Sequence, residues 1–289
     1  GYGDRTCDIV DALERQGVNM VFAIGGDGTQ KGALDIAEEV KRRDLRTVVV
    51  GIPKTIDNDL SFVQRSFGFE TSVSMAVQAV QGAHVEARGA INGIGIVKVM
   101  GRQSGFIAAH TALAMNDVNF VLIPEVPFDL SGDNGLLRHL EKRLLRRHHA
   151  VLLVAEGAGQ DLLQDAKAKD NSGNKKLADV GPYPTQEGAH YSRQRNMDIN
   201  IKHIDPSYII RSAPANANDS IYCARLGGNA VHAAMSGRTG LIISLLHDRF
   251  VHVPMRLAVT TRNCVDPEGR LWRDVVEATG QAQLMKNLG

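Results

Sequence analysis

The sequence lacks the features of membrane, disulfide-linked and nucleic-acid-binding proteins. Within its 289 residues no apolar run is long enough to span a bilayer, and no stretch is patterned as a signal peptide. Its three cysteines form no metal-binding pattern and cannot all pair, so we expect a reducing, cytoplasmic setting. The formal net charge of +1 provides no general attraction to nucleic acid or to a membrane surface. We therefore expect a globular protein with one large or two smaller domains.

The Walker-type motif GxxxxGK[ST] is also absent, but another glycine-rich turn is present. The run GGDGT at residues 25–29 separates a predicted strand at 18–24 from a predicted helix at 30–43. Glycines let backbone N–H groups approach phosphate oxygens, and the start of the helix favours an anion. Asp27 can hold a magnesium ion that bridges phosphates, and Thr29 offers a hydroxyl. A tight turn with a capping threonine is the alternative, but the strand–turn–helix context favours phosphate binding.

A second polar loop, GIPKTIDND at residues 51–59, follows a short β-branched strand at 47–52. Its position at the end of a strand is where open α/β sheets place ligands. Asp57 and Asp59 are two residues apart and point the same way in an extended segment, so they can converge on one ligand. One can accept a proton from a hydroxyl while the other helps to hold a cation. An Asx turn is the alternative, because Asp and Asn are common turn residues.

Strands and helices alternate through the first half of the chain, which is typical of a doubly wound, mostly parallel α/β sheet, here with a second, smaller α/β lobe. The turns at Gly25, Pro53, Met100 and Glu156 each follow a predicted strand, and we expect them to share one edge and form one site. Beyond residue 157 the pattern fades, and 165–176 is typical of a solvated loop. The predicted strands are 18–24, 47–52, 95–99, 118–123 and 150–155, followed by a strand-like stretch at 197–204 and a hairpin of 241–246 with 250–253. Besides 30–43, helices are predicted between about 4 and 17, at 70–88, from 102 to about 115, at 133–147 and at 220–235, with a short last helix around Trp272.

Cationic and histidine residues elsewhere have simpler interpretations. The run at residues 142–149, KRLLRRHH, is rich in cations. It resembles an anion site, but we interpret it as the C-terminal end of a helix, where the helix dipole favours cations. His84, His110 and His232 lie on predicted helices without metal-ligand spacing, so we expect them to pack or hydrogen-bond rather than bind metal.

Taken together, the motifs resemble the ATP-dependent 6-phosphofructokinase family, in particular its branch from plants and some protists and bacteria. The resemblance covers nearly the whole chain. The motifs that carry it are GGDGTQKG at 25–32, PKTIDND at 53–59, MGRQSGF at 100–106, IPE at 123–125, AEGAGQ at 155–160 and DPSYIIR at 205–211.

The resemblance implies phosphoryl transfer from ATP to the 1-hydroxyl of fructose 6-phosphate, a step of glycolysis, and assigns a role to each matching residue. Asp57 is the implied base, and Asp27 the implied ligand of Mg²⁺. Gly26, Gly28 and Thr29 are expected to line the ATP phosphates, and Thr55 and Ile56, with Asp57, to lie against the sugar and the transferred group. The residues implied to hold the sugar are Met100, Gly101, Arg102 and Glu156, and those implied to bind its 6-phosphate are Tyr208 and Arg211, assisted by Lys202.

The same resemblance implies a lobe organisation and an assembly. Residues 1–123 with part of 148–181 are expected to form a nucleotide-binding lobe, and 124–147 with 182–289 a sugar-phosphate-binding lobe. Because neighbouring subunits contribute sugar-phosphate contacts in the family, we expect a homo-oligomer, either a dimer or a tetramer, with no nucleic acid or membrane partner.

The identity of the phosphoryl donor depends on two positions. Pyrophosphate-using relatives have an aspartate where Gly28 stands, which crowds and repels an α-phosphate, and they have a lysine where Lys54 stands. The glycine decides whether ATP fits, so we expect ATP as donor, with pyrophosphate as the alternative. Lipid and NAD kinases also contain GGDGT, but without the combination of PKTIDND and MGR.

The family also has an upstream strand with a glycine-rich loop that closes over ATP, and an arginine-bearing loop that touches the phosphates. Neither precedes Gly1, so we expect material to be missing upstream. A truncated, non-catalytic subunit that binds sugar phosphate is therefore a further alternative.

Overall fold

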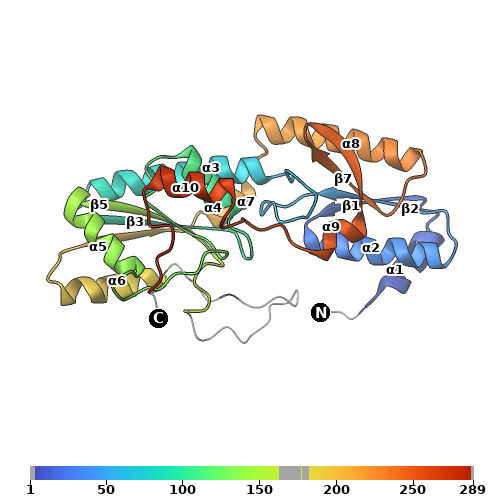
Figure 1. The fold of residues 1–289 in the computed structure, drawn as a ribbon. Coiled ribbons are helices and arrows are strands. Elements are labelled where there is room, and N and C mark those ends of the chain that lie inside the picture. Colours follow the sequence, from blue (N-terminus) through green and yellow to red (C-terminus); the bar gives the residue numbers. More distant parts are fainter. Residues whose placement is uncertain (1–3, 163–176, 178–181, 288–289) are drawn as a thin grey trace. The chain divides into compact units, whose positions relative to one another are not determined.

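The computed structural model describes residues 4–162, 177 and 182–287, which form an α/β fold (Figure 1). Among these residues, no helix combines the length and apolarity that a bilayer span requires. The helices are α1 (Thr6–Arg15), α2 (Asp27–Arg42), α3 (Phe69–Arg88), α4 (Phe106–Ala114), α5 (Leu136–Arg147), α6 (Pro182–Gln194), α7 (Ser207–Ser212), α8 (Ala217–Met235), α9 (Met255–Thr260) and α10 (Arg270–Thr279). The strands are β1 (Met20–Gly25), β2 (Val48–Pro53), β3 (Gly93–Val99), β4 (Phe120–Leu122), β5 (His149–Ala155), β6 (Asn200–Ile204), β7 (Leu241–Leu246) and β8 (Arg249–Pro254).

The chain divides into two compact units, each with its own sheet. Unit 1 comprises Gly1–Glu70 and Ala215–Asn263, and unit 2 comprises Thr71–Pro214 and Cys264–Gly289. These boundaries differ from the predicted lobes, 1–123 with part of 148–181 and 124–147 with 182–289. Strand pairing explains the difference, because β7 joins β2 whereas β3 joins β5 and β6. The functional assignment of the two lobes remains a prediction.

Unit 1 contains a sheet in the order β1-β2-β7-β8, parallel except for the β7–β8 hairpin. Helix α8 covers one face, and α2 and α9 cover the other (Figure 1). Val48 and Val50 pack toward α8, whereas Val49 packs toward α2 and α9. The unbroken apolar run in β2 therefore reflects burial on both faces, and the predicted doubly wound architecture is confirmed.

Unit 2 contains a fully parallel sheet in the order β4-β5-β3-β6. Helices α5 and α6 lie on one face, and α3, α4 and α10 lie on the other (Figure 1). Helix α3 approaches β3 so closely that a Cβ on Gly93 would lie 2.1 Å from the carbonyl oxygen of Ala87. Because the strands belong to two sheets, the expectation that all four polar turns share one edge is wrong.

Most predicted elements are present, with three short or weakly patterned helices added. The β7–β8 hairpin turns at His247 and Asp248, both with positive φ, which matches the twist of a two-residue hairpin. Helices α6, α7 and α9 were not predicted, because their sequences carry little helical periodicity. The loop predicted at 165–176 lies outside the described residues.

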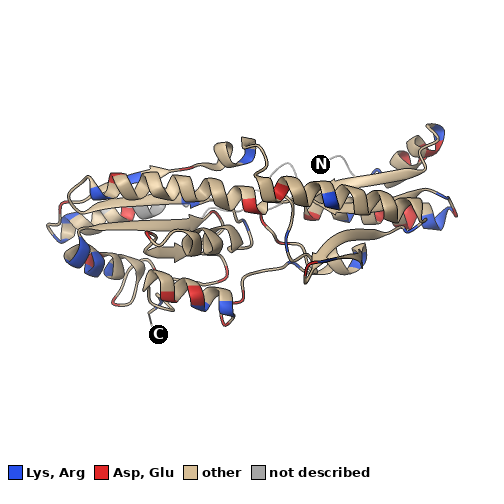
Figure 2. Cartoon of the chain, turned by 90° about the horizontal axis from the view of Figure 1, so that it is seen from above, with Lys and Arg blue, Asp and Glu red and all other residues tan. Residues whose placement is uncertain are grey.

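The predicted basic run occupies the last turns of α5, where Lys and Arg gather in Figure 2. Arg143 donates from Nε to the carbonyl oxygen of His149 at 3.2 Å, and His148 ends the helix in the left-handed conformation. With residues from β4 and the end of α10, these cations line an open cavity of about 350 Å³.

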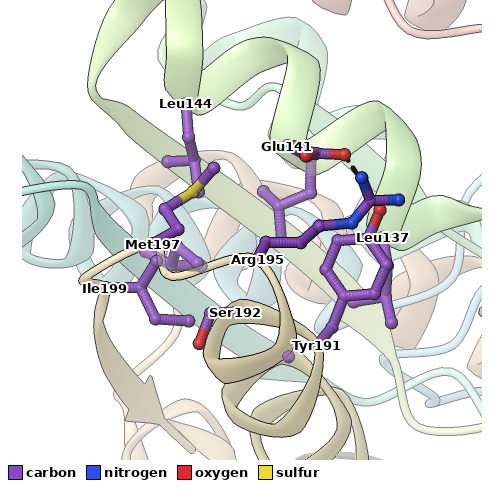
Figure 3. Close-up of a pocket in the computed structure, with 11 residues that line it drawn as sticks. Leu137, Glu141, Leu144, Tyr191, Ser192, Arg195, Met197 and Ile199 are labelled. Carbon is purple, nitrogen blue, oxygen red and sulfur yellow. Dashed lines mark hydrogen bonds between the residues drawn. The ribbon is translucent and has the colours of Figure 1, made fainter.

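A second, much smaller cavity lies between α5 and α6 (Figure 3). Its volume is about 20 Å³, enough for about one water molecule. Glu141 at its wall is 8% exposed and accepts hydrogen bonds from Arg138 Nη1 at 2.6 Å and the hydroxyl of Tyr191 at 2.9 Å. This cavity is too small for a nucleotide or a sugar phosphate.

Candidate active site

The glycine-rich turn lies at the carboxyl end of β1, and α2 begins at Asp27. The three glycines of this turn differ in what a side chain at each position would contact. A Cβ on Gly25 would lie 2.2 Å from Thr29 Oγ1, and one on Gly26 would lie 3.4 Å from Cβ of Thr55. A Cβ on Gly28 would meet nothing within 4 Å. The turn is therefore packed on its inner side and open at Gly28, next to the first N–H groups of a helix, which is suitable for an anion.

The Gln30 side chain connects this turn to the neighbouring strand β2 by hydrogen bonds. The residue is fully buried, and its Nε2 lies 3.0 Å from the carbonyl oxygen of Gly25 and 3.1 Å from that of Ile52. Gly51 makes room for the side chain, because a Cβ there would lie 2.2 Å from Oε1 of Gln30. The carboxyl ends of β1 and β2 are thus held side by side, with Lys54 N donating to Gly25 O at 3.0 Å.

The loop after β2 is folded by its turn-forming residues. Asn58 has φ +55° and is 5% exposed. Its Oδ1 accepts from Ser66 N at 2.8 Å, and its Nδ2 donates to Gln64 O at 3.3 Å. Oγ1 of Thr55 accepts from Asp57 N at 3.2 Å, and Oδ1 of Asp57 is shielded from solvent. The turn interpretation therefore holds for Asn58, whose side chain bonds within the loop.

Arg262 joins the two loops. Its Nη2 lies 2.9 Å from Asp27 Oδ2, and its Nη1 lies 3.4 Å from Asp59 Oδ2. Burial raises the pKa of Asp59, the Arg262 guanidinium opposes this shift, and the nearby Asp27 carboxylate adds to it. Arg262 was not predicted as a site residue, because it follows the short helix α9 and belongs to no sequence motif.

The backbone holds Arg262 in this place. Leu60 and Arg262 form an isolated antiparallel bridge, and Asn263 N donates to Asp59 O at 2.9 Å. Ser61 Oγ donates to Thr261 O at 2.8 Å. The loop between β2 and α3 (residues 54–68), here called the carboxylate loop, is therefore bonded to the segment 261–263 within unit 1.

In unit 2, two of the predicted sugar-binding turns lie next to each other. Val99 of β3 pairs with Ala155 of β5, so the turns that follow are neighbours. Gly157 N donates to Gly101 O at 3.1 Å, and Gly101 has φ +130°. This brings Arg102 and Glu156 to the same edge. Met100 is 2% exposed, so its side chain is buried below this edge.

The remaining predicted residues of unit 2 lie in two places, on α7 and in the middle of β6. Tyr208 and Arg211 lie three residues apart on α7, both exposed, just beyond the carboxyl end of β6. Lys202 is exposed and lies in the middle of β6, opposite Gly95, about 13 Å of strand from the β3 terminus at Val99. Lys202 is thus set apart from the edge that Arg102 and Glu156 share.

Two further ionic groups at this edge were not assigned from sequence. Lys98 Nζ lies 2.8 Å from Asp205 Oδ2. Partial burial raises the pKa of Asp205, but hydrogen bonds from Lys98 and Ser207 outweigh it and lower the pKa overall. Glu125 Oε1 accepts from Gly105 N at 2.9 Å and from Val265 N at 2.8 Å, while burial raises the pKa of this carboxyl.

The donor set in unit 1 is compatible with Mg²⁺. Among the described residues no cluster of three or more His, Cys, Asp or Glu could hold a metal unaided. Mg²⁺, however, commonly uses one or two carboxylates together with phosphate oxygens and water. Asp27 and Asp59 provide two such carboxylates, 12% and 8% exposed, next to the open space at Gly28.

The family model for phosphofructokinase matches residues 4–234. An ATP-dependent 6-phosphofructokinase of Borreliella burgdorferi is 59% identical over 99% of this chain and 65% of its own length. A chloroplastic ATP-dependent 6-phosphofructokinase of Arabidopsis thaliana is 44% identical over 96% of this chain and 52% of its own length. The chain thus spans about one half to two thirds of these relatives.

Solved structures show the same fold. A pyrophosphate-dependent phosphofructokinase of Marinobacter aquaeolei has a TM-score of 0.75 at 19% identity, covering 96% of this chain and 71% of that one. A phosphofructokinase of Pichia pastoris in the T-state has a TM-score of 0.70 at 21% identity, covering 88% of this chain and 26% of that one. From the family match and the sequence relatives together, the chain belongs to the phosphofructokinase family.

Proposed function

We propose that this protein transfers a phosphoryl group from ATP to the 1-hydroxyl of fructose 6-phosphate, giving fructose 1,6-bisphosphate in glycolysis. The observation that carries the proposal is the pairing of two loops at adjacent carboxyl strand ends, one open to an anion and one bearing Asp57 and Asp59. The relatives named ATP-dependent 6-phosphofructokinase support this choice of reaction.

Asp57 is the proposed base, which accepts the proton of the attacking hydroxyl. Phosphoryl transfer requires mainly positioning and charge stabilisation, with one carboxylate for the proton. Asp27, helped by Asp59, is the proposed holder of Mg²⁺, which when bound neutralises charge on the phosphates. The backbone of Gly26 and Gly28 and the hydroxyl of Thr29 are proposed to bind phosphate oxygens.

Sugar binding is the next proposed role. Thr55 and Ile56, with Asp57, are proposed to lie against the sugar, and Met100, Gly101, Arg102 and Glu156 to hold it. Arg102 presents a planar fork that suits phosphate or paired hydroxyls. Tyr208 and Arg211, assisted by Lys202, are the residues proposed to bind the sugar 6-phosphate.

The proposed donor is ATP, because the open space at Gly28 leaves room for an α-phosphate that an aspartate would repel. Lys54, which matches pyrophosphate-using relatives, keeps pyrophosphate as the alternative donor. We further propose a cytoplasmic homo-oligomer, a dimer or tetramer, in which a neighbouring subunit completes the sugar-phosphate site. A subunit that binds sugar phosphate without turnover is the second candidate function.

A coupled assay with fructose 6-phosphate and either ATP or pyrophosphate tests this proposal on the full-length protein. We expect turnover with ATP and Mg²⁺, and little with pyrophosphate. In Asp57→Asn we expect kcat to fall by about 10²–10⁴-fold, because proton transfer is lost, while the dissociation constant for fructose 6-phosphate stays within about twofold. An unchanged kcat would remove Asp57 as the base, and sugar-phosphate binding without turnover in the wild type would favour the non-catalytic alternative.

A further inference from the structure

Arg262 lies between the two carboxylates that the proposed function assigns to the metal–nucleotide. Asp27 and Asp59 are 12% and 8% exposed, and the guanidinium that joins them is 29% exposed. Two nearly buried like charges on adjacent loops repel each other unless a cation lies between them. Arg262 supplies that cation from a distant part of the chain.

The Asp27 oxygen that faces Arg262, Oδ2, already contacts two cationic side chains. Asp27 Oδ2 is 2.9 Å from Arg262 Nη2 and 2.9 Å from Lys31 Nζ. Lys31 is 51% exposed and flexible, so it can leave this oxygen easily. The Arg262 guanidinium is more enclosed, and its fork reaches both carboxylates. A metal ion that binds through this oxygen must therefore compete with Arg262.

We propose that Arg262 is a positioning residue. In the metal-free protein it keeps the carboxylates of Asp27 and Asp59 close together, and its ion pair with Asp27 breaks when the metal binds. This inference rests on the proposed role of Asp27 as a metal ligand. Only the side chain needs to move, because the backbone stays fixed by the Leu60–Arg262 bridge and by the bond from Asn263 N to Asp59 O. The released guanidinium remains next to the phosphate turn, where it can form charge-assisted bonds to phosphate oxygens.

The test uses Mg²⁺ alone, without nucleotide or sugar, and follows thermal unfolding of the full-length protein. Without divalent cation, Arg262→Met should unfold several degrees below the wild type, because two carboxylates lose their shared cation. Mg²⁺ should restore most of this loss, with a half-saturating concentration at least about fivefold lower than in the wild type, because the competing guanidinium is gone. Arg262→Lys, which keeps one positive charge, should lie between the two.

Two controls make the result specific. Arg256→Met removes a 76% exposed arginine of α9 that pairs with Glu38, and it should leave the Mg²⁺ response unchanged. Adding Asp27→Asn to Arg262→Met should abolish the enhanced response. Equal Mg²⁺ responses in the wild type and Arg262→Met, or no response in either, would overturn the proposal, as would persistence of the response in the double variant. Because no sugar or nucleotide is present, the result is separate from whether the protein has kinase activity.

Discussion

At the residue scale, single buried polar groups decide how the active-site loops are held. Tyr222 of α8 is 3% exposed, and its hydroxyl donates to the carbonyl oxygen of Arg65 at 2.6 Å, at the end of the carboxylate loop. The Arg65 guanidinium lies 5.1 Å from the centre of the ring. Burial raises the pKa of Tyr222 to about 12, although Arg65 opposes the shift and Asp219 adds to it. This phenol is thus a structural anchor that depends on staying protonated.

Tyr222→Phe tests this anchor through pH. The folded-state pKa of about 12 lies above the pKa of 10.0 of the free tyrosine side chain. The stability that this shift provides is therefore complete below pH 10 and is lost as pH rises through 12. We expect the wild type to lose about 2–3 kcal/mol more than Tyr222→Phe across this range. Urea unfolding at several alkaline pH values measures the difference, and parallel curves would contradict it.

At the element scale, the loop between β2 and α3 is shaped by Asn58 rather than by its aspartates. The Asn58 side chain satisfies Ser66 N and binds Gln64 O, while its backbone adopts the left-handed conformation. Asparagine tolerates this conformation better than other residues with a side chain. The catalytic candidate Asp57 is thereby placed by its neighbour.

Asn58→Ala and Asn58→Gly separate the two contributions. Both leave Ser66 N without the Asn58 acceptor, at a cost of about 1–3 kcal/mol. Only alanine adds the cost of the left-handed backbone, about 1–2 kcal/mol. We expect both variants to be destabilised in chemical unfolding, Asn58→Ala the more strongly. Equal destabilisation would show that the backbone conformation contributes little.

At the scale of the whole molecule, the chain crosses between the units three times, near residues 70, 214 and 263. Each unit has its own hydrophobic core: Ile243 and Leu226 are fully buried in unit 1, and Leu152 is 1% exposed in unit 2. Trp272, the single tryptophan, is 1% exposed in unit 2. Its fluorescence therefore reports on one unit only.

Core truncations in each unit should therefore have distinct readouts. Leu152→Ala and Ile243→Ala should each cost about 2–5 kcal/mol in their own unit, because each leaves a cavity in a packed core. We expect Leu152→Ala to lower the midpoint of the Trp272 fluorescence transition. Ile243→Ala should lower the far-UV circular dichroism transition and leave the Trp272 midpoint nearly unchanged. If both signals shift together in both variants, the units unfold as one cooperative body.

Much of the local structure could be predicted because it is encoded by neighbouring residues. The apolar period of α8, the β-branched run of β2 and the two-residue turn at His247-Asp248 depend on local sterics and side-chain alternation. The glycine-rich turn after β1 was predicted for the same reason. Lys202 was placed with the sugar-phosphate residues by family resemblance alone, and its register opposite Gly95 could not be predicted from its neighbours in the sequence.

What the sequence by itself determined was the family, the α/β class and the two polar loops that follow β1 and β2. Only the tertiary structure decided that the strands divide between two sheets, and that Arg262 meets Asp27 from 235 residues further along the chain. Strand pairing and long-range ion pairs depend on which surfaces are buried against each other, and no local period or spacing in the sequence carries that information.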